Sequence, residues 1–100
     1  MFRIVGKIDA LTGPDLQAAA GSAINGGNPR VIFDMRGVTY ISSAGLRVIV
    51  LTTKHAKAAK GGLAIFGLQP VISEFFEKAG LGTVIPIVSS ETEARSKLGA

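Results

Sequence analysis

The chain has 100 residues, of which 47% are hydrophobic and 18% charged, and its net charge is +4. This composition is typical of one small folded domain, here residues 1–100, and excludes a disordered tail. The sequence has no cysteine, which excludes disulfides and thiolate sites, and no apolar run long enough for a signal peptide or a membrane span, so we expect a cytoplasmic protein.

The basic residues are scattered along the chain rather than gathered beside aromatic ones. Three of them, Lys54, Lys57 and Lys60, fall near the end of one predicted helix, where cations complement the helix dipole. Aromatic residues make up only 6% of the chain, and most stand in apolar runs. The sequence therefore predicts no direct binding of nucleic acid.

The first predicted elements are a strand and a helix. Residues Phe2–Ile8 alternate well enough for a strand. Thr12 is the expected N-cap of the following helix, with Asp15 as its capping-box partner and Pro14 in the first turn. The run Asn25-Gly26-Gly27-Asn28-Pro29 ends this helix.

The central part of the chain joins a buried strand to an apolar helix. The strand spans Arg30–Met35, and its unbroken apolar middle predicts burial on both faces of a sheet. Residues 34–37 lead out of the strand toward a polar turn of small residues. A helix then runs from Leu46 to Lys60 and ends at Gly61-Gly62.

The last third repeats the same alternation of strands and helices. A strand is predicted over Leu63–Phe66, and a helix opens at Gln69-Pro70 with an inner face of Val71, Ile72, Phe75, Phe76 and Ala79. A fourth strand covers Thr83–Val88, where Pro86 favours an edge position. A capping box at Ser90 then begins a helix that reaches Leu98.

The order strand-helix, repeated four times, predicts an α/β fold. The expected sheet has four strands, or five with one more at the start, and is a largely parallel mixed sheet with right-handed crossovers.

Two serines, Ser42 and Ser43, stand before the central helix. Serine is a preferred N-cap, so capping alone explains most such pairs. The surrounding residues carry more information, namely Ile32-Phe33-Asp34, Tyr40-Ile41-Ser42-Ser43-Ala44-Gly45-Leu46-Arg47 and Gly61-Gly62-Leu63. This stretch resembles the STAS domain, the family of anti-sigma factor antagonists, and nearly the whole chain follows that pattern. The family usually has an extra strand before the one that contains Gly6, and we expect this chain to start too late for a complete one.

The resemblance implies a protein-binding regulator switched by phosphorylation. In the bacterial regulators of this family the serine two residues before the glycine is phosphorylated, which corresponds to Ser43, with Ser42 as the cap or a secondary site. An aspartate often stands where this chain has Ser42. The implied partner is an anti-sigma factor with serine-kinase activity, which uses ATP and magnesium, while this domain needs no cofactor and no metal.

Helical periodicity gives the central helix two apolar faces. Leu46, Ile49, Val50 and Thr53 share the face predicted to meet the core. A second set faces the other way, and it consists of Ala44, Val48, Leu51 and His55. Either a neighbouring helix covers this second face or a partner docks on it, and the resemblance favours docking.

The resemblance also implies which residues meet the partner. Asp9 and Asp34 are expected in loops at strand ends, where each carboxylate can simply accept backbone N–H groups in a turn. By the resemblance, both also lie near the Ser43 turn. Gly45 either lets a partner's backbone approach or leaves the first helical turn uncrowded. The expected partner-binding set is Asp9, Thr12, Asp34, Ser42, Ser43, Ala44, Gly45, Arg47, Val48 and Leu51.

Sequence patterns of enzymes are missing. The chain has no phosphate-binding loop, no dinucleotide fingerprint and no nucleophile elbow, and its single histidine, His55, stands alone. We therefore expect a regulator that acts as a monomer or weak dimer.

An alternative is a STAS adaptor subunit of a transporter ATPase or sensory assembly without a phosphorylation switch, which Ser42 in place of aspartate favours. A nucleotide-binding role is a third possibility.

Overall fold

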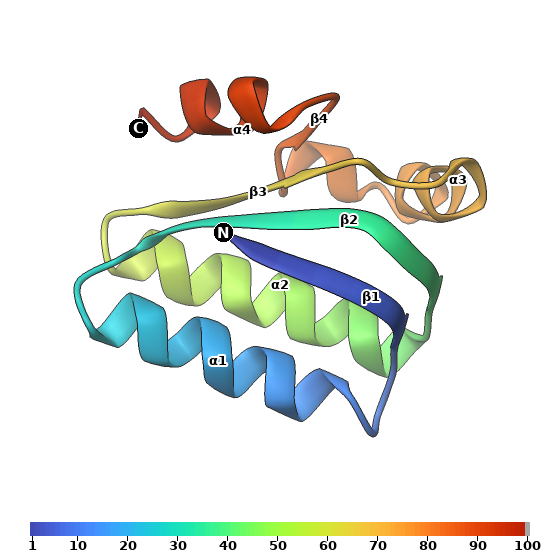
Figure 1. Cartoon of the computed structure of the whole chain (residues 1–100), viewed down its shortest axis with the longest axis horizontal. Helices are drawn as coiled ribbons and strands as arrows, with labels where there is room; N and C mark the ends of the chain where they lie inside the picture. The colour runs from blue at the N-terminus through green and yellow to red at the C-terminus, as the bar shows by residue number, and fades with distance from the viewer. Residues whose placement is uncertain (100) are drawn as a thin grey trace.

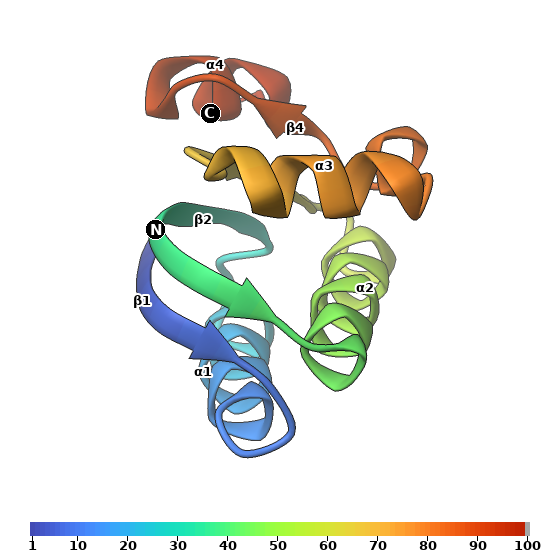
Figure 2. The same ribbon diagram turned by 90° about the vertical axis from the view of Figure 1, so that its right-hand side faces the viewer.

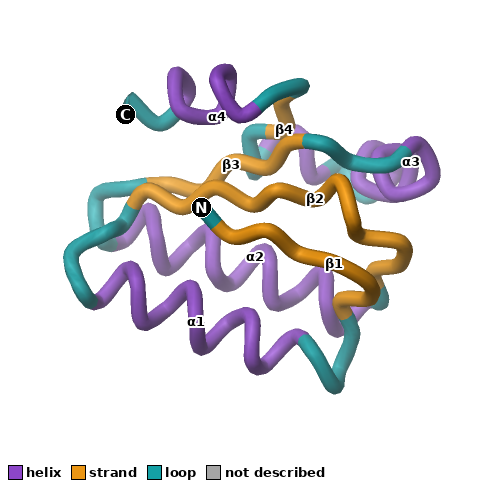
Figure 3. Tube along the Cα trace, viewed as in Figure 1, coloured by secondary structure: helices purple, strands orange, loops and turns teal. Residues whose placement is uncertain are grey.

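The computed structural model describes residues 1–99, in which strands and helices alternate (Figure 1, Figure 3). In chain order the elements are β1 Phe2–Ile8, α1 Gly13–Asn25, β2 Arg30–Ile41, α2 Ser43–Ala58, β3 Gly62–Phe66, α3 Pro70–Lys78, the short 3₁₀ helix η1 Leu81–Thr83, β4 Ile87–Val88 and α4 Glu91–Lys97. Strand β2 and helix α2 meet at Ser42 and Ser43, which we call the serine turn.

The strands form one sheet in the order β1-β2-β3-β4, and every pair in it is parallel. Helices α1 and α2 lie together on one face, and α4 lies on the other (Figure 1, Figure 2). The predicted α/β fold with a four-stranded sheet is therefore confirmed, although within residues 1–99 no antiparallel strand makes the sheet a mixed one.

The central strands are buried on both faces, as the apolar run in β2 predicted. The larger core lies between the sheet and helices α1 and α2, and it includes Phe33, Ile49 and Leu63. A smaller core under α4 includes Phe66 and Ala94. Two helical layers thus cover the middle of the sheet and hold the end of β2 in place.

Strand β2 is longer than the sequence predicts, because it continues past Met35 to Ile41. Its pairing with β1 runs from Phe2 opposite Phe33 to Ile8 opposite Ile41, with two register shifts on the way. The expected exit from the strand at residues 34–37 is therefore wrong. A long-range partner strand supplies hydrogen bonds there and overrides the local turn signal.

Helix starts and the last strand also differ in detail from the expectations. Thr12 is the N-cap residue of α1 but its side chain makes no capping hydrogen bond. Ser90 does cap α4 by accepting the N–H of Glu93 at 3.1 Å, whereas the Glu93 carboxylate accepts the Ser89 hydroxyl instead of completing the box. Strand β4 is only two residues long and lies at the edge of the sheet, as Pro86 predicted.

Candidate functional site

The turn between β2 and α2 is fastened to the end of β1. The N–H of Ser42 donates to the carbonyl of Ile8 at 2.9 Å. Ser42 is also the N-cap of α2, since its hydroxyl accepts the N–H of Gly45 at 3.1 Å and its carbonyl accepts that of Leu46. The capping role expected of Ser42 is confirmed, and it fixes where the helix begins.

Gly45 lies directly against the backbone of Ile8. A Cβ atom at position 45 would collide with the Ile8 carbonyl group. The close approach that glycine permits is therefore made by the chain's own strand β1, and Gly45 is buried. This corrects the expectation that Gly45 lies on the partner-binding surface.

Ser43 is the first residue of α2, and it is exposed. Within residues 1–99 its hydroxyl forms no hydrogen bond, because Ser42 already provides the cap. The first turn of α2 contains no acidic residue. The Ser43 hydroxyl is thus free to react, at the positive end of a helix dipole.

Asp9 and Thr12 form a closed loop beside this turn, directly after β1. The Asp9 carboxylate accepts the N–H groups of Leu11 and Thr12 at 2.9 and 3.0 Å, and the Thr12 hydroxyl donates to the Lys7 carbonyl at 2.8 Å. The backbone N–H of Thr12, and then that of Leu11, lower the pKa of Asp9. Both side chains therefore shape the loop, which explains why Thr12 does not cap α1.

Asp34 lies in the middle of β2, in register with Arg3 of β1 and Phe66 of β3. Its side chain is 1% exposed and accepts hydrogen bonds from Nε and Nη2 of Arg36, at 3.0 and 2.7 Å, and Nε of Arg3 lies 3.5 Å from it. The Arg36 guanidinium lowers the pKa of Asp34 to about 2. The expectation of a loop residue beside Ser43 is wrong for Asp34, because β2 continues for seven residues beyond it before the serine turn.

The exposed face of α2 is narrower than periodicity predicts. Ala44, Arg47 and Leu51 are exposed, with Leu51 at 39%. Val48 is buried at 8% and packs on Gly13 of α1. At Val48 a neighbouring helix covers this face of α2, which is one of the two expected alternatives. Val48 is therefore not available to a partner.

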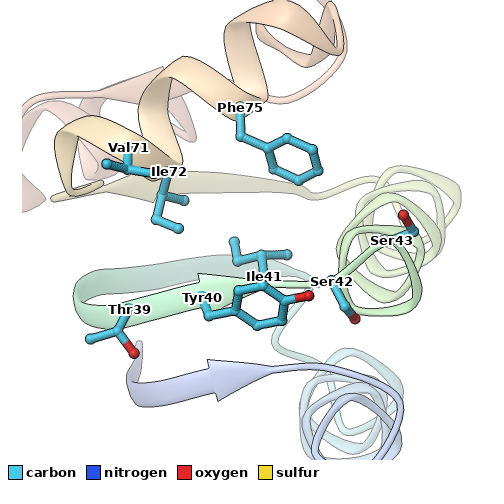
Figure 4. A pocket seen from close by; sticks show the side chains of 8 residues that line it. All are labelled: Thr39, Tyr40, Ile41, Ser42, Ser43, Val71, Ile72 and Phe75. Atoms are coloured by element: carbon cyan, nitrogen blue, oxygen red, sulfur yellow. The ribbon is translucent and has the colours of Figure 1, made fainter.

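A groove that sequence reasoning missed lies between the end of β2 and α3. It has a volume of about 380 Å³, and its lining residues are Thr39, Tyr40, Ile41, Ser42, Ser43, Val71, Ile72 and Phe75 (Figure 4). Ile41 and Ile72 are buried, whereas Tyr40 is 50% exposed, Val71 76% and Phe75 37%.

Sequence reasoning missed the groove because it assigned too many residues of α3 to the core. Only Ile72 and Phe76 of that helix are buried, so the inner face predicted for Val71, Phe75 and Ala79 is wrong. At about 100° per residue the five residues spread over an arc of about 140°, and only the edge with Ile72 and Phe76 is turned into the core. The surplus of large apolar residues in α3 was the signal that could have revealed an apolar surface next to Ser43.

A match to a known protein family agrees with this fold and with the serine turn. The model of the STAS domain matches residues 1–94. The chain belongs to the STAS domain family. The resemblance found in the sequence is thereby confirmed over nearly the whole chain.

Relatives of this STAS domain include named regulators of transcription. It is 33% identical over 89 residues to BtrV of Bordetella bronchiseptica, a candidate anti-sigma factor antagonist, which covers 89% of this chain and 77% of BtrV. It is 31% identical over 90 residues to the anti-sigma-B factor antagonist of Listeria monocytogenes, covering 90% and 79% of the two chains.

Solved structures share the fold at lower identity. An anti-sigma factor antagonist from Mycobacterium paratuberculosis superposes with a TM-score of 0.84 at 21% identity, over 98% of this chain and 83% of the other. The phosphorylated form of the Bacillus cell fate determinant SpoIIAA gives 0.69 at 21% identity, over 95% and 86%. These likenesses establish the STAS fold for this chain.

Residues 1–99 contain neither a metal-binding cluster of side chains nor a membrane-spanning helix. No group of three or more histidine, cysteine, aspartate or glutamate side chains in this range is placed to hold a metal ion. None of the helices in the same range has the length and apolar character needed to cross a membrane.

Proposed function

We propose that this STAS domain is an anti-sigma factor antagonist whose binding is switched off by phosphorylation of Ser43. It binds an anti-sigma factor through three neighbouring surfaces: the turn that carries Ser43, the exposed face of α2 and the groove between β2 and α3. The observation that carries the proposal is the position of Ser43. This residue is exposed, does not cap the helix and lies on the rim of that groove. The names of the curated relatives support the same role.

The partner in this proposal is an anti-sigma factor with serine-kinase activity. The Ser43 oxygen forms a bond to the γ-phosphorus of ATP while the bond from that phosphorus to the bridging oxygen breaks. ADP leaves, and the hydroxyl proton passes to a base of the kinase. ATP and magnesium are bound by the kinase, so the STAS domain supplies only the hydroxyl. Such a regulator works in the cytoplasm, as a monomer or weak dimer.

Phosphorylation acts on the interface rather than on the fold. The phosphate brings about −1.5 to −2 charges at neutral pH to a helix N-terminus, where negative charge is tolerated. The same dianion stands on the rim of a groove lined by Tyr40, Val71 and Phe75. Burying it against a partner's apolar surface costs desolvation. The unmodified protein therefore binds and the phosphorylated protein releases.

The test is a pull-down from a lysate of the source cells with wild type, Ser43→Ala and Ser43→Asp. Thr92→Asp is the matched control, because Thr92 is also exposed in the first turn of a helix but lies in α4 on the opposite face of the sheet. The proposal expects wild type, Ser43→Ala and Thr92→Asp to recover an anti-sigma factor of the kinase type, and Ser43→Asp to lose it. Incubation of the recovered kinase with ATP and each variant, followed by mass spectrometry, then locates the phosphate.

The other outcomes have definite meanings. If all four proteins recover the same partner equally, or a transporter subunit, the adaptor function replaces the switch, and Ser43 is a constitutive contact. The N-cap made by Ser42 without an aspartate is compatible with that role. Phosphate found only at residues other than Ser43 removes the switch as proposed. A third role is tested by calorimetric titration with purine nucleotides, where an absence of heat excludes nucleotide binding.

A further inference from the structure

Arg47 and Ser43 are neighbours on the exposed face of α2. Both residues are exposed, and both belong to the same helix, four positions apart. Residues at this spacing have Cβ atoms about 5–6 Å apart, and an acidic group four positions before a basic one is the favourable order for an ion pair. The unmodified serine has no charge, so the arginine is placed for a pair that does not yet exist.

Arg47 has no carboxylate partner among the described residues. The ion pairs of residues 1–99 join Arg3 and Arg36 to Asp34, Lys78 to Glu74 and Arg95 to Glu91. Asp9 follows β1 beside the serine turn, and its carboxylate already accepts two backbone N–H groups and the Thr12 hydroxyl. Nothing in this range therefore competes for the guanidinium.

We propose that Arg47 binds the phosphate of phosphorylated Ser43 within the same helix. The inference rests on the proposed function, since it assumes that Ser43 is the modified residue. A phosphate on Ser43 is the first negative group in this helical turn, which has no acidic residue of its own. The planar guanidinium donates charge-assisted hydrogen bonds to the phosphate oxygens from one side.

Helix α2 presents donors from the other side. Ser42 occupies the N–H of Gly45 and leaves the N–H groups of Ser43 and Ala44 without an acceptor within the described fold. A phosphate on Ser43 therefore lies between the free N–H groups of the helix start and the guanidinium of Arg47. The dianion is bound by its own chain rather than left to solvent.

This arrangement changes what a partner meets. In the unmodified protein the exposed face of α2 offers Arg47 and Lys54 to acidic groups of a partner. Once phosphorylated, the same face offers a guanidinium already paired with phosphate. Phosphorylation thus removes a cation from the interface at the same time as it adds an anion, and Arg47 is a positioning residue of the switch.

The experiment follows the phosphate itself. Phosphoserine is incorporated at position 43 during translation, so the measurement needs neither the kinase nor the partner. The second pKa of the phosphate is then measured by ³¹P NMR titration at low ionic strength in wild type, Arg47→Gln and Lys54→Gln. Lys54 is the matched control, because it is exposed on the same helix but lies eleven positions beyond Ser43. Circular dichroism checks that each variant keeps its helices.

A nearby guanidinium favours the dianion, so the phosphate pKa is expected to be lower in wild type by about 0.3 pH unit or more than in Arg47→Gln. Lys54→Gln is expected to match wild type, and the difference is expected to shrink in 1 M salt because added ions screen the pair. Equal pKa values in wild type and Arg47→Gln overturn the inference, as does an equal change in Lys54→Gln. If the kinase does not phosphorylate Ser43, the proposed function is wrong. The titration still tests whether Arg47 binds a phosphate at position 43.

Discussion

The carbonyl group of Ile8 occupies the space that a side chain on Gly45 would need. Through this contact, and the hydrogen bond from Ser42 to Ile8, the start of α2 rests on the end of β1. The serine turn is therefore held by two strands, not only by the one that leads into it.

Replacement of Gly45 by alanine is expected to destabilise the domain. The added methyl group meets backbone, which cannot rotate away, so we expect a loss of about 1–3 kcal/mol in the free energy of unfolding. Urea denaturation followed by circular dichroism measures it. The control is Gly82→Ala, because a Cβ at Gly82 meets nothing within 4 Å. Equal stability of the two variants would show that β1 and α2 are not in close contact.

The two serines of the turn are expected to respond differently to alanine. Ser42→Ala removes the N-cap of α2 and should cost about 1 kcal/mol of stability. Ser43→Ala removes an exposed hydroxyl and should change stability by less than about 0.5 kcal/mol. Chemical denaturation of both variants under the same conditions measures the difference. A larger loss in Ser43→Ala would contradict the division of roles between them.

Asp34 makes stability depend on acid pH. Its pKa is lowered from 3.8 to about 2 by Arg36, so the folded state favours the carboxylate. The resulting stabilisation is present above about pH 4 and is lost as the pH falls through about 2. The full shift corresponds to about 2.4 kcal/mol, and the actual contribution is smaller because Arg36 is largely exposed and solvent screens the pair.

Urea denaturation between pH 2 and pH 6 checks this dependence in wild type and Asp34→Asn. The stability gap between the two proteins should be widest at pH 6 and narrow toward pH 2. Glu77→Gln, at an exposed residue of α3, serves as the control. A gap that stays constant across this range would mean that the ion pair adds nothing to folding.

The apolar rim of the groove is expected to contribute to partner binding. Phe75→Ala and Tyr40→Ala each remove a partly exposed ring beside Ser43. Aromatic residues in such positions often dominate interface energies, and we expect each variant to bind the recovered anti-sigma factor about tenfold more weakly, or about 1.4 kcal/mol. Isothermal titration calorimetry gives the affinities. Val84→Ala tests specificity, because Val84 is 40% exposed but lies outside the groove; a similar loss there would argue against the groove.

Local patterns predicted the elements that depend on local chemistry. The capping role of Ser42 followed from its preference for helix starts, and the burial of β2 followed from its apolar run. Strand Phe2–Ile8 was predicted with the bounds that the structure has. Such features need only neighbouring residues to be specified.

Features that depend on distant residues were not predictable in this way. Asp34 looked like a loop residue because nothing near it in sequence reveals that β1 pairs alongside. Val48 looked available because the periodicity of α2 does not show that α1 covers it. The groove arises where α3 meets the end of β2, and neither segment alone contains it. Each case is decided by tertiary contacts that override local propensity.

The hydrogen bond from Gly45 to Ser42 leaves its neighbour Ser43 without any task in folding. A phosphate attached to Ser43 would therefore change the charge of the surface without breaking a hydrogen bond of the unmodified fold. Under the proposed switch, Ser43 would be phosphorylated and dephosphorylated repeatedly with no need for the domain to unfold, and the two states would differ at the surface.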